Sequence, residues 1–418
     1  MKSLKSILFA GLLVMISTGV ARAQSGSAVL LVDDDRTQCP TAEFSTIQAA
    51  IDAASPGQQI RVCAGTYNEQ LSIQKTVLLA ADDGVILIPS GMTANANGTG
   101  GGDPIATAIL VKNATGVHIT GFRVDGSANG VAACAPRLIG VLFEDASGFV
   151  AHNAIRHFRL NSSLAGCQSG NAIEIQTDTG GSSQVTINDN SVDDYQKNGI
   201  TANEAGSSAK IEGNTVTGIG STSGAAQNGV QIGFGAAGTI TGNTISNHLW
   251  APCVSATQCD TNATGILIFE SSGVVIGSNS VGNNNIGVFS NGDNTHIESN
   301  HISNSVVLDG VVLQSNGDVA LSNSIVQSDE AAIALQGENN HIISNEFLAA
   351  DIGILIGPGS TGSNHYNNQF FALLQNVVTA SADAAAKQTG STTAAAAVNS
   401  ARVITPSVSS SKRVSPSR

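Results

Sequence analysis

One asparagine-centred phrase recurs along the chain and constrains the fold more than any other feature. From residue 150 onward, phrases such as "GNTI" place an Asn two residues before Val, Ile or Phe. The last five of these Asn are spaced by 21, 23, 22 and 23 residues, and the earlier gaps run from 24 to 37. A fixed period of this size indicates a repeat architecture. The nine positions are Asn153, Asn190, Asn214, Asn243, Asn279, Asn300, Asn323, Asn345 and Asn368.

Apolar residues keep a register around these Asn. The residue two positions later is apolar in every repeat, and the residue three positions earlier is apolar in all but the last, which has His365. Each repeat also has a second phrase, such as "NGI", "TGI" or "IGV", that opens a short alternating strand. Leucine-rich repeats share this period but require an L-x-x-L-x-L pattern that is absent. The sequence therefore predicts an all-β, single-stranded, right-handed parallel β-helix of about twelve coils.

The repeated Asn have a structural explanation in such a solenoid. Stacked coils lie about 4.8 Å apart, so amides at equivalent turns can bond to each other and to the turn backbone. We favour this role over ligand binding for the nine Asn. Their positions resemble the ladder of the pectin-lyase-like β-helix superfamily, which lies in the turn between the second and third sheets.

The N-terminal part has its own signature, "CPTAEFSTIQAAIDAASPGQQIRVCAGTYNEQLSIQK". Apolar residues at helical spacing predict a helix over 45–54, with Ser45 as its N-cap and "SPG" as its stop. Such a helix would cover the open end of the solenoid, whose strand edges are otherwise unpaired. The stretch resembles the opening of exported bacterial β-helix repeat proteins, and the resemblance covers roughly residues 30–375.

The two ends of the chain differ from the repeats. Residues 1–23 have a positive start, an apolar core and an A-x-A site, as a signal peptide does, which predicts export to an extracellular or periplasmic compartment. We assign 24–376 to the β-helix domain and 377–418, rich in Ala, Ser and Thr, to a tail that we expect to be disordered. Within 370–388 we expect a terminal cap, helical in form.

Charge and cysteine content limit the partners. Of 18 basic residues, three lie in the signal segment, which leaves 15 basic against 31 acidic residues and a net charge near −16. This argues against nucleic acid as a partner, and no later stretch is apolar enough for membrane insertion. In an oxidising compartment the six Cys are expected to form disulfides. Their placement favours Cys39–Cys63, Cys134–Cys167 and Cys253–Cys259, although six Cys allow 15 pairings.

In the superfamily that the chain resembles, polysaccharides usually bind along the first sheet, whose strands follow the "G-I/V" phrases. If the apolar residue after each Gly points inward, its neighbours point outward. These neighbours are polar and acidic over the early coils and apolar over the later ones. They are Leu142, Glu144, Glu174, Gln176, Thr201, Asn203, Gln231, Leu267, Phe269, Phe289, Val312, Gln314, Ala334, Gln336 and Leu355.

The early, polar half offers candidate catalytic residues. A β-helix lyase needs carboxylates that hold Ca²⁺ against a uronate and a basic residue that takes a proton, whereas a hydrolase needs two or three carboxylates. The candidates are Glu174, Asp178, Asp194, Lys197 and Arg156, with Glu144, Gln176, Asn203 and Gln231 as substrate contacts. The alternative, which we favour, is that they are solvated turn residues of an acidic protein.

Specific enzyme motifs are missing. A polygalacturonase would need N-T-D, D-D, G-H-G and R-I-K in order, and the chain has only "QTD" and "DD". The catalytic segments of pectin methylesterases are also absent, and no pectate-lyase Arg motif is evident.

The later, apolar half suggests a binding surface. Trp250, Phe269 and Phe289 could form an aromatic platform for sugar rings. Alternatively, this apolar strip is covered by the 246–263 loop, by the C-terminal cap or by another subunit in an oligomer. His296 and His341 are two coils apart, too far to share a metal ion.

The sequence thus predicts an exported β-helix protein directed at carbohydrate, and binding and cleavage both remain open. The second hypothesis is a non-catalytic scaffold or adhesion protein of the envelope or the extracellular space. No cofactor is certain. Calcium would belong to the lyase alternative, and "VDDDR" (32–36) is a second place where it could bind, although a solvated acidic turn is the simpler explanation.

Overall fold

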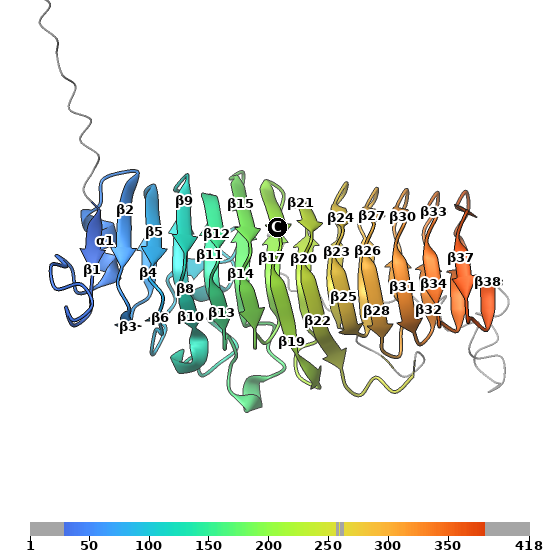
Figure 1. Cartoon of the computed structure of the whole chain (residues 1–418), viewed down its shortest axis with the longest axis horizontal. Helices are drawn as coiled ribbons and strands as arrows, with labels where there is room; N and C mark the ends of the chain where they lie inside the picture. The colour runs from blue at the N-terminus through green and yellow to red at the C-terminus, as the bar shows by residue number, and fades with distance from the viewer. Residues whose placement is uncertain (1–28, 256–258, 260–262, 381–418) are drawn as a thin grey trace, which may run out of the picture.

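A computed structural model describes residues 29–255, 259 and 263–380. Three long parallel sheets run the length of the molecule, and each coil contributes one strand to each sheet (Figure 1). The predicted β-helix fold is confirmed. The predicted signal peptide and most of the predicted tail lie outside the described residues. No helix in the described part of the chain is both long and apolar enough to cross a membrane.

The first sheet has thirteen strands, of which β7 pairs antiparallel with β8 and the others stack in parallel. They are β4 (Leu71–Ile73), β7 (Ala96–Asn97), β8 (Pro104–Lys112), β11 (Arg137–Glu144), β14 (Asn171–Gln176), β17 (Asn198–Asn203), β20 (Asn228–Gly233), β23 (Thr264–Phe269), β26 (Ile286–Asn291), β29 (Val311–Leu313), β32 (Ala331–Leu335), β35 (Ile352–Ile356) and β38 (Gln375–Thr379).

The second sheet also has thirteen strands, all parallel. They are β1 (Leu30–Val32), β2 (Gln58–Val62), β5 (Val77–Ala81), β9 (Val117–Thr120), β12 (Ser147–Ala151), β15 (Ser183–Asn188), β18 (Ser207–Glu212), β21 (Ala237–Thr241), β24 (Val275–Gly277), β27 (His296–Glu298), β30 (Val319–Leu321), β33 (His341–Ile343) and β36 (Asn364–Tyr366).

The third sheet has twelve strands. They are β3 (Gly65–Tyr67), β6 (Val85–Leu87), β10 (Arg123–Asp125), β13 (Ala154–Arg156), β16 (Ser191–Asp193), β19 (Thr215–Thr222), β22 (Thr244–Trp250), β25 (Ser280–Asn284), β28 (His301–Ser305), β31 (Ser324–Ser328), β34 (Glu346–Leu348) and β37 (Gln369–Phe371).

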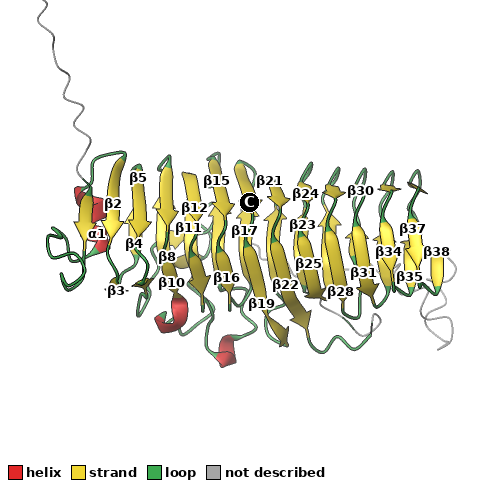
Figure 2. Cartoon of the chain, in the orientation of Figure 1, coloured by secondary structure: helices red, strands yellow, loops and turns green. Residues whose placement is uncertain are grey.

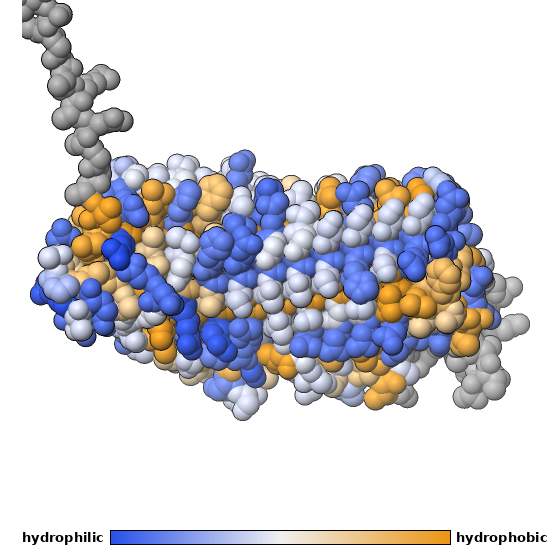
Figure 3. Space-filling model, viewed as in Figure 1, coloured by the Kyte–Doolittle hydropathy of each residue, from blue (hydrophilic) through white to orange (hydrophobic). Residues whose placement is uncertain are grey.

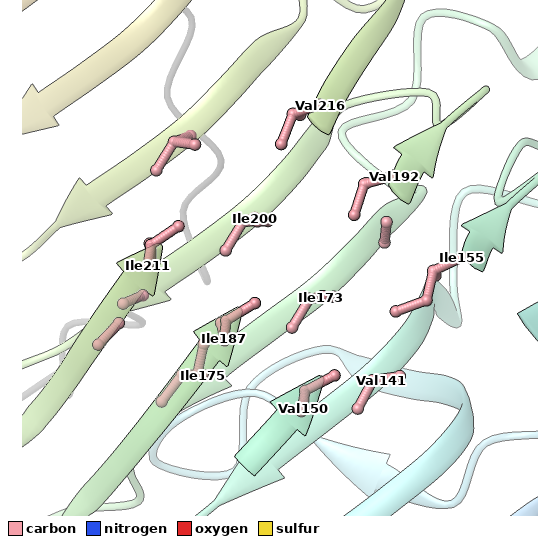
Figure 4. Packing of buried hydrophobic residues seen from close by; sticks show 14 of the residues in the cluster. Val141, Val150, Ile155, Ile173, Ile175, Ile187, Val192, Ile200, Ile211 and Val216 are labelled. Atoms are coloured by element: carbon pink, nitrogen blue, oxygen red, sulfur yellow. The ribbon is translucent and has the colours of Figure 1, made fainter. Parts of the chain in front are cut away.

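The interior is a continuous column of aliphatic side chains. Residues from all three sheets meet in it, and Figure 4 shows Val141, Val150 and Ile155 among those that pack together. The glycine of the "G-I/V" phrase is required by this packing. A Cβ on Gly229 would lie 2.5 Å from Cγ2 of Ile245 and 2.6 Å from the carbonyl oxygen of Gly265. Any larger residue there would force the coils apart.

The predicted asparagine ladder is confirmed from Asn153 to Asn368. At each step the Nδ2 of one Asn donates to the Oδ1 of the next, at 2.9–3.1 Å. The ladder lies between the second and third sheets, as predicted. The residue before each rung has a positive φ, for example Ser278 at 55° and Gly242 at 66°. Gly, Asp, Asn and His, the residues that tolerate such a turn best, precede five of the nine rungs, and Ser precedes the other four.

The N-terminal helix α1 (Ile47–Ala53) is present, and Figure 2 shows it at the N-terminal end of the sheets. Its N-cap is Thr46, whose side chain accepts from Ala49 N, so the predicted N-cap Ser45 is wrong by one residue. Glu69 on the next coil accepts from Ile47 N at 2.8 Å and from Gln48 N at 2.9 Å. Two single 3₁₀ turns, η1 (Gly126–Ala128) and η2 (Ser162–Leu164), are the other helices among the described residues.

At the C-terminal end the predicted helical cap is wrong over the described residues. Strands β37 and β38 continue the third and first sheets, and β38 pairs with β35 through Thr379. The same apolar periodicity that builds the earlier coils therefore extends past the predicted boundary at residue 376. The three predicted disulfides, Cys39–Cys63, Cys134–Cys167 and Cys253–Cys259, are all present.

Candidate functional site

The outer face of the first sheet does not have the exposure predicted for it. The predicted outward positions do align across the coils, and their apolar members form clusters separate from the solenoid core. All but three of the fifteen are buried, however. Phe269, Gln314 and Gln336 are half-buried. The alternating pattern gives the direction of a side chain but not what covers it.

Over β8 and β11, the covering element is the 88–103 loop. Ala96 of this loop packs with Leu110, Ile139 and Leu142. Gln176, a predicted substrate contact, donates from Nε2 to Asn97 O at 2.9 Å. Gln176 is thus held by the chain itself.

Over the later coils, the predicted open aromatic platform is wrong. Phe289 is fully buried in a cluster with Leu267 and Val312, and Trp250 and Phe269 pack against that cluster. Cys259 belongs to the same cluster and Cys253 packs against it, so the disulfide of the 246–263 loop lies over the strip, as the alternative of a loop-covered strip predicts. This apolar strip is therefore largely buried within the chain itself.

Between these two apolar patches lies a polar island on β14, β17 and β20. Asn198 donates from Nδ2 to Thr201 Oγ1 at 3.0 Å and to Gln231 Oε1 at 3.1 Å. Gln231 donates onward to Asn203 Oδ1 at 2.9 Å. The positions that correspond to Thr201 on β11 and β26 are the apolar Leu142 and Phe289, so this polar network is replaced by apolar packing on either side of the middle coils.

The two glutamates of this face are ion-paired. Arg137 donates from Nη2 to Glu174 Oε1 at 3.3 Å and from Nη1 to Glu174 Oε2 at 3.4 Å. Glu174 also accepts from Asn171 Nδ2 at 2.7 Å. Glu144 pairs with Lys112 at 2.7 Å. The outward positions next to the "G-I/V" phrases do not include Arg137, because it lies at the start of its strand, before the phrase.

Lys197, a predicted catalytic base, immediately precedes β17. Its Nζ donates to Ala226 O at 2.7 Å, and burial lowers the pKa of this amine to about 7. The lowered pKa reflects the cost of holding a charged ammonium away from water.

The other predicted catalytic residues lie in different places. Asp178 is exposed beyond β14, where Thr179 N and Gly100 N donate to it and hold its pKa below the usual range. Arg156 pairs with Asp193, and Asp194 pairs with Arg159 at 2.6 Å. Both ion pairs lie at the C-terminal ends of strands β13 and β16 of the third sheet. Among the described contacts, none joins Glu174 to Asp178, Asp194 or Arg156.

Sequence reasoning missed an open hollow of about 300 Å³ over the second sheet. Its lining includes Phe149, Gln184, Thr186, Ser208 and Lys210 from β12, β15 and β18. The Phe149 ring is 43% exposed and lies 4.5 Å from the ring of His118. The sequence does contain a signal for this site: Phe149 is an aromatic residue at an outward position where the next coils have the polar residues Thr186, Lys210 and Thr239.

The surroundings of the hollow are polar. Lys210 is exposed and paired with Glu212 at 2.8 Å, which leaves little net charge at its rim. Figure 3 shows that the visible face of the molecule is mostly hydrophilic, with separate hydrophobic patches. No carboxylate lines the hollow.

Metal-ligating groups in the described residues are few. Cys39, Cys63 and Asp82 are close together, but both sulfurs are bound in a disulfide. Asp33, Asp34 and Asp35 also cluster, and each carboxylate accepts from a nearby backbone N–H: Cys39, Thr66 and Thr37 respectively. The "VDDDR" stretch is therefore built as a hydrogen-bonded turn.

Comparison with known proteins agrees with this architecture. A family model described as "Right handed beta helix region" matches residues 171–370. No curated protein sequence matches the chain. Among solved structures, it is similar to the GH136 lacto-N-biosidase from Eubacterium ramulus, with a TM-score of 0.54 and 11% identity over 84% of this chain and 68% of that one.

Two further structures are similar to the same degree. XylC in complex with xylose has a TM-score of 0.53 and 11% identity, over 82% of this chain and 86% of that one. The Dettilon tailspike protein has a TM-score of 0.52 and 14% identity, over 84% of this chain and 66% of that one. Identities this low establish a shared fold and not a shared activity.

Proposed function

We propose that this right-handed parallel β-helix protein binds a neutral polysaccharide without cleaving it, and that the hollow over the second sheet is the binding surface. The observation that carries the proposal is the exposed Phe149 ring, flanked by His118 and by the polar side chains of Gln184 and Ser208. A sugar ring has an apolar C–H face and a hydroxylated edge. An aromatic ring beside hydrogen-bonding groups matches both.

Charge supports a neutral ligand. The described rim has Lys210 paired with Glu212, and the mature chain is strongly acidic. A polyanionic glycan would meet repulsion from the protein as a whole, without a compensating basic patch at the hollow.

The positions of the carboxylates favour binding over catalysis. A glycoside hydrolase needs two carboxyl groups facing each other across the scissile bond. Glu174 and Glu144 are instead buried in ion pairs, and Asp194 is paired with Arg159 at another edge. The similar structures include a lacto-N-biosidase and a complex with xylose, which supports carbohydrate as the ligand class through the fold alone.

The test is a panel of neutral and acidic polysaccharides, scored for binding and for reducing or unsaturated products. We expect binding of at least one neutral glycan without products. Phe149→Ala should weaken that binding at least tenfold, since it removes the stacking surface. Phe371→Ala is the matched control, because Phe371 is equally exposed, at 44%, on the third sheet.

Two results would contradict the proposal. Products released by the purified protein would show that it is an enzyme. Binding that survives Phe149→Ala but is lost in Glu174→Gln would return the site to the first sheet.

A further inference from the structure

Three acidic residues lie on consecutive coils at the N-terminal ends of strands of the first sheet, away from the hollow. Glu330 and Asp351 directly precede β32 and β35, and Asp309 lies two residues before β29. Backbone bonds place them on consecutive coils: Glu330 N donates to Leu308 O, and Ile352 N donates to Glu330 O at 3.0 Å. Equivalent positions on neighbouring coils are about 4.8 Å apart. The strand register aligns Glu330 with Asp351 and places Asp309 opposite Ala331, the residue after Glu330.

Asp309 is fully buried, and half of its carboxylate is unsatisfied. Its Oδ1 accepts from Ala331 N at 3.0 Å, whereas its Oδ2 has no hydrogen-bond partner. Buried polar atoms are almost always paired, so an unpaired carboxylate oxygen requires an explanation such as an ion. No ion pair found in the described part of the chain involves Asp309, Glu330 or Asp351.

The two inner carboxyls repel each other. Oδ1 of Asp309 accepts from the backbone N of Ala331, the residue after Glu330, so the two carboxyl groups belong to the same part of the stack. Nearby, Asp351 is exposed and adds negative charge, and the exposed Asp329 accepts from Val307 N. The buried carboxylate of Asp309 can be ionised only if hydrogen bonds or a cation compensate its charge, and half-buried Glu330 adds a second negative charge beside it.

We infer that Asp309 and Glu330 bind a Ca²⁺ ion that links the coils of β29 and β32. Calcium takes six to eight oxygen ligands from carboxylates, carbonyls and water. The unpaired Oδ2 of Asp309 supplies a ligand from inside, and half-buried Glu330 supplies one from the solvent side. Asp351, at the exposed end of the stack, attracts the cation and leaves room for water to complete the coordination.

The test uses the full-length exported chain, stripped of metal with EDTA and titrated with CaCl₂ in a calorimeter at pH 8. The wild type should bind Ca²⁺, and its thermal unfolding temperature should rise with added Ca²⁺. Asp309→Asn and Glu330→Gln should each weaken binding at least tenfold at this site. Glu330→Gln keeps the test valid if the buried Asp309 variant folds poorly, because Glu330 is partly exposed.

Two variants serve as controls. Asp318→Asn changes a buried carboxyl whose oxygens are both bonded, to Thr295 N and to Ser315 Oγ, and Asp34→Asn changes the other acidic cluster. Both should keep the Ca²⁺ response. If Ca²⁺ neither binds nor stabilises the wild type, or if the response survives both Asp309→Asn and Glu330→Gln, then the pair holds only a proton and the inference is wrong.

Discussion

Asn243 illustrates how much a single residue contributes in this molecule. Its Oδ1 accepts from both the backbone N and the Nδ2 of Asn214, and its own Nδ2 donates to Asn279 Oδ1 and to Ile211 O. The side chain is 1% exposed, so water cannot replace these partners. One amide thereby satisfies groups on three successive coils.

Replacing this amide should therefore be costly. We expect Asn243→Ala to lower the free energy of unfolding by at least about 2 kcal/mol, because each buried group left unpaired costs about 1–3 kcal/mol. Urea denaturation followed by circular dichroism measures the change. Asn364→Ala, on the exposed strand β36, is the control and should be nearly neutral. Equal effects of the two changes would argue against the ladder as a source of stability.

The buried carboxyl group of Asp318 should make the stability of the protein depend on pH. Burial raises its pKa to about 7, although Thr295 N and Ser315 Oγ donate to it. In the unfolded chain the carboxyl titrates near 3.9, so between about pH 4 and 7 the folded state binds more protons and stability falls as pH rises. Asp318→Asn should remove this loss.

The gain from Asp318→Asn should thus be larger at pH 8 than at pH 4, by up to about 4 kcal/mol at ~1.4 kcal/mol per pKa unit. Denaturation midpoints at the two pH values measure it. A gain that is independent of pH would mean that the carboxyl is not protonated in the folded state.

At the scale of elements, the loops decide what the first sheet exposes. The strands of its early and late coils carry apolar outward residues, which the 88–103 loop and the Cys253–Cys259 loop cover. The second loop is held by a disulfide between residues only six apart. Trp250, the only tryptophan of the chain, packs against the cluster beneath it.

Opening this loop should give a local signal. In Cys253→Ser/Cys259→Ser we expect red-shifted Trp250 fluorescence and binding of a hydrophobic dye, because the cluster around Phe289 loses part of its cover. Far-UV circular dichroism should stay unchanged, since each coil depends mainly on its neighbours. Unchanged fluorescence would show that the packing does not depend on the disulfide.

On the scale of the whole molecule, the solenoid converts a short repeat into long continuous surfaces. The central outward row of the second sheet runs across neighbouring coils from His118 through Phe149 to Thr186 and Lys210. A polysaccharide is also a linear repeat, so an extended row is a suitable partner for it. This geometry is the reason for placing the proposed ligand across several coils.

The sequence by itself determined the repeat and the ladder, and it favoured the disulfide pairing that the structure has. Asn, Gly and the apolar residues recur at fixed spacing, because every coil must meet the same packing and hydrogen-bonding conditions as its neighbours. Local pattern was thus sufficient wherever contacts are between adjacent coils. It failed at the C-terminal end, where an expected helix is strand β38.

Only the tertiary structure decided which faces are open. Alternation shows that Phe289 and Gln176 point away from the core, but their burial depends on loops that leave the repeat and return over the sheet. Such contacts join residues far apart in the chain, and no local pattern encodes them.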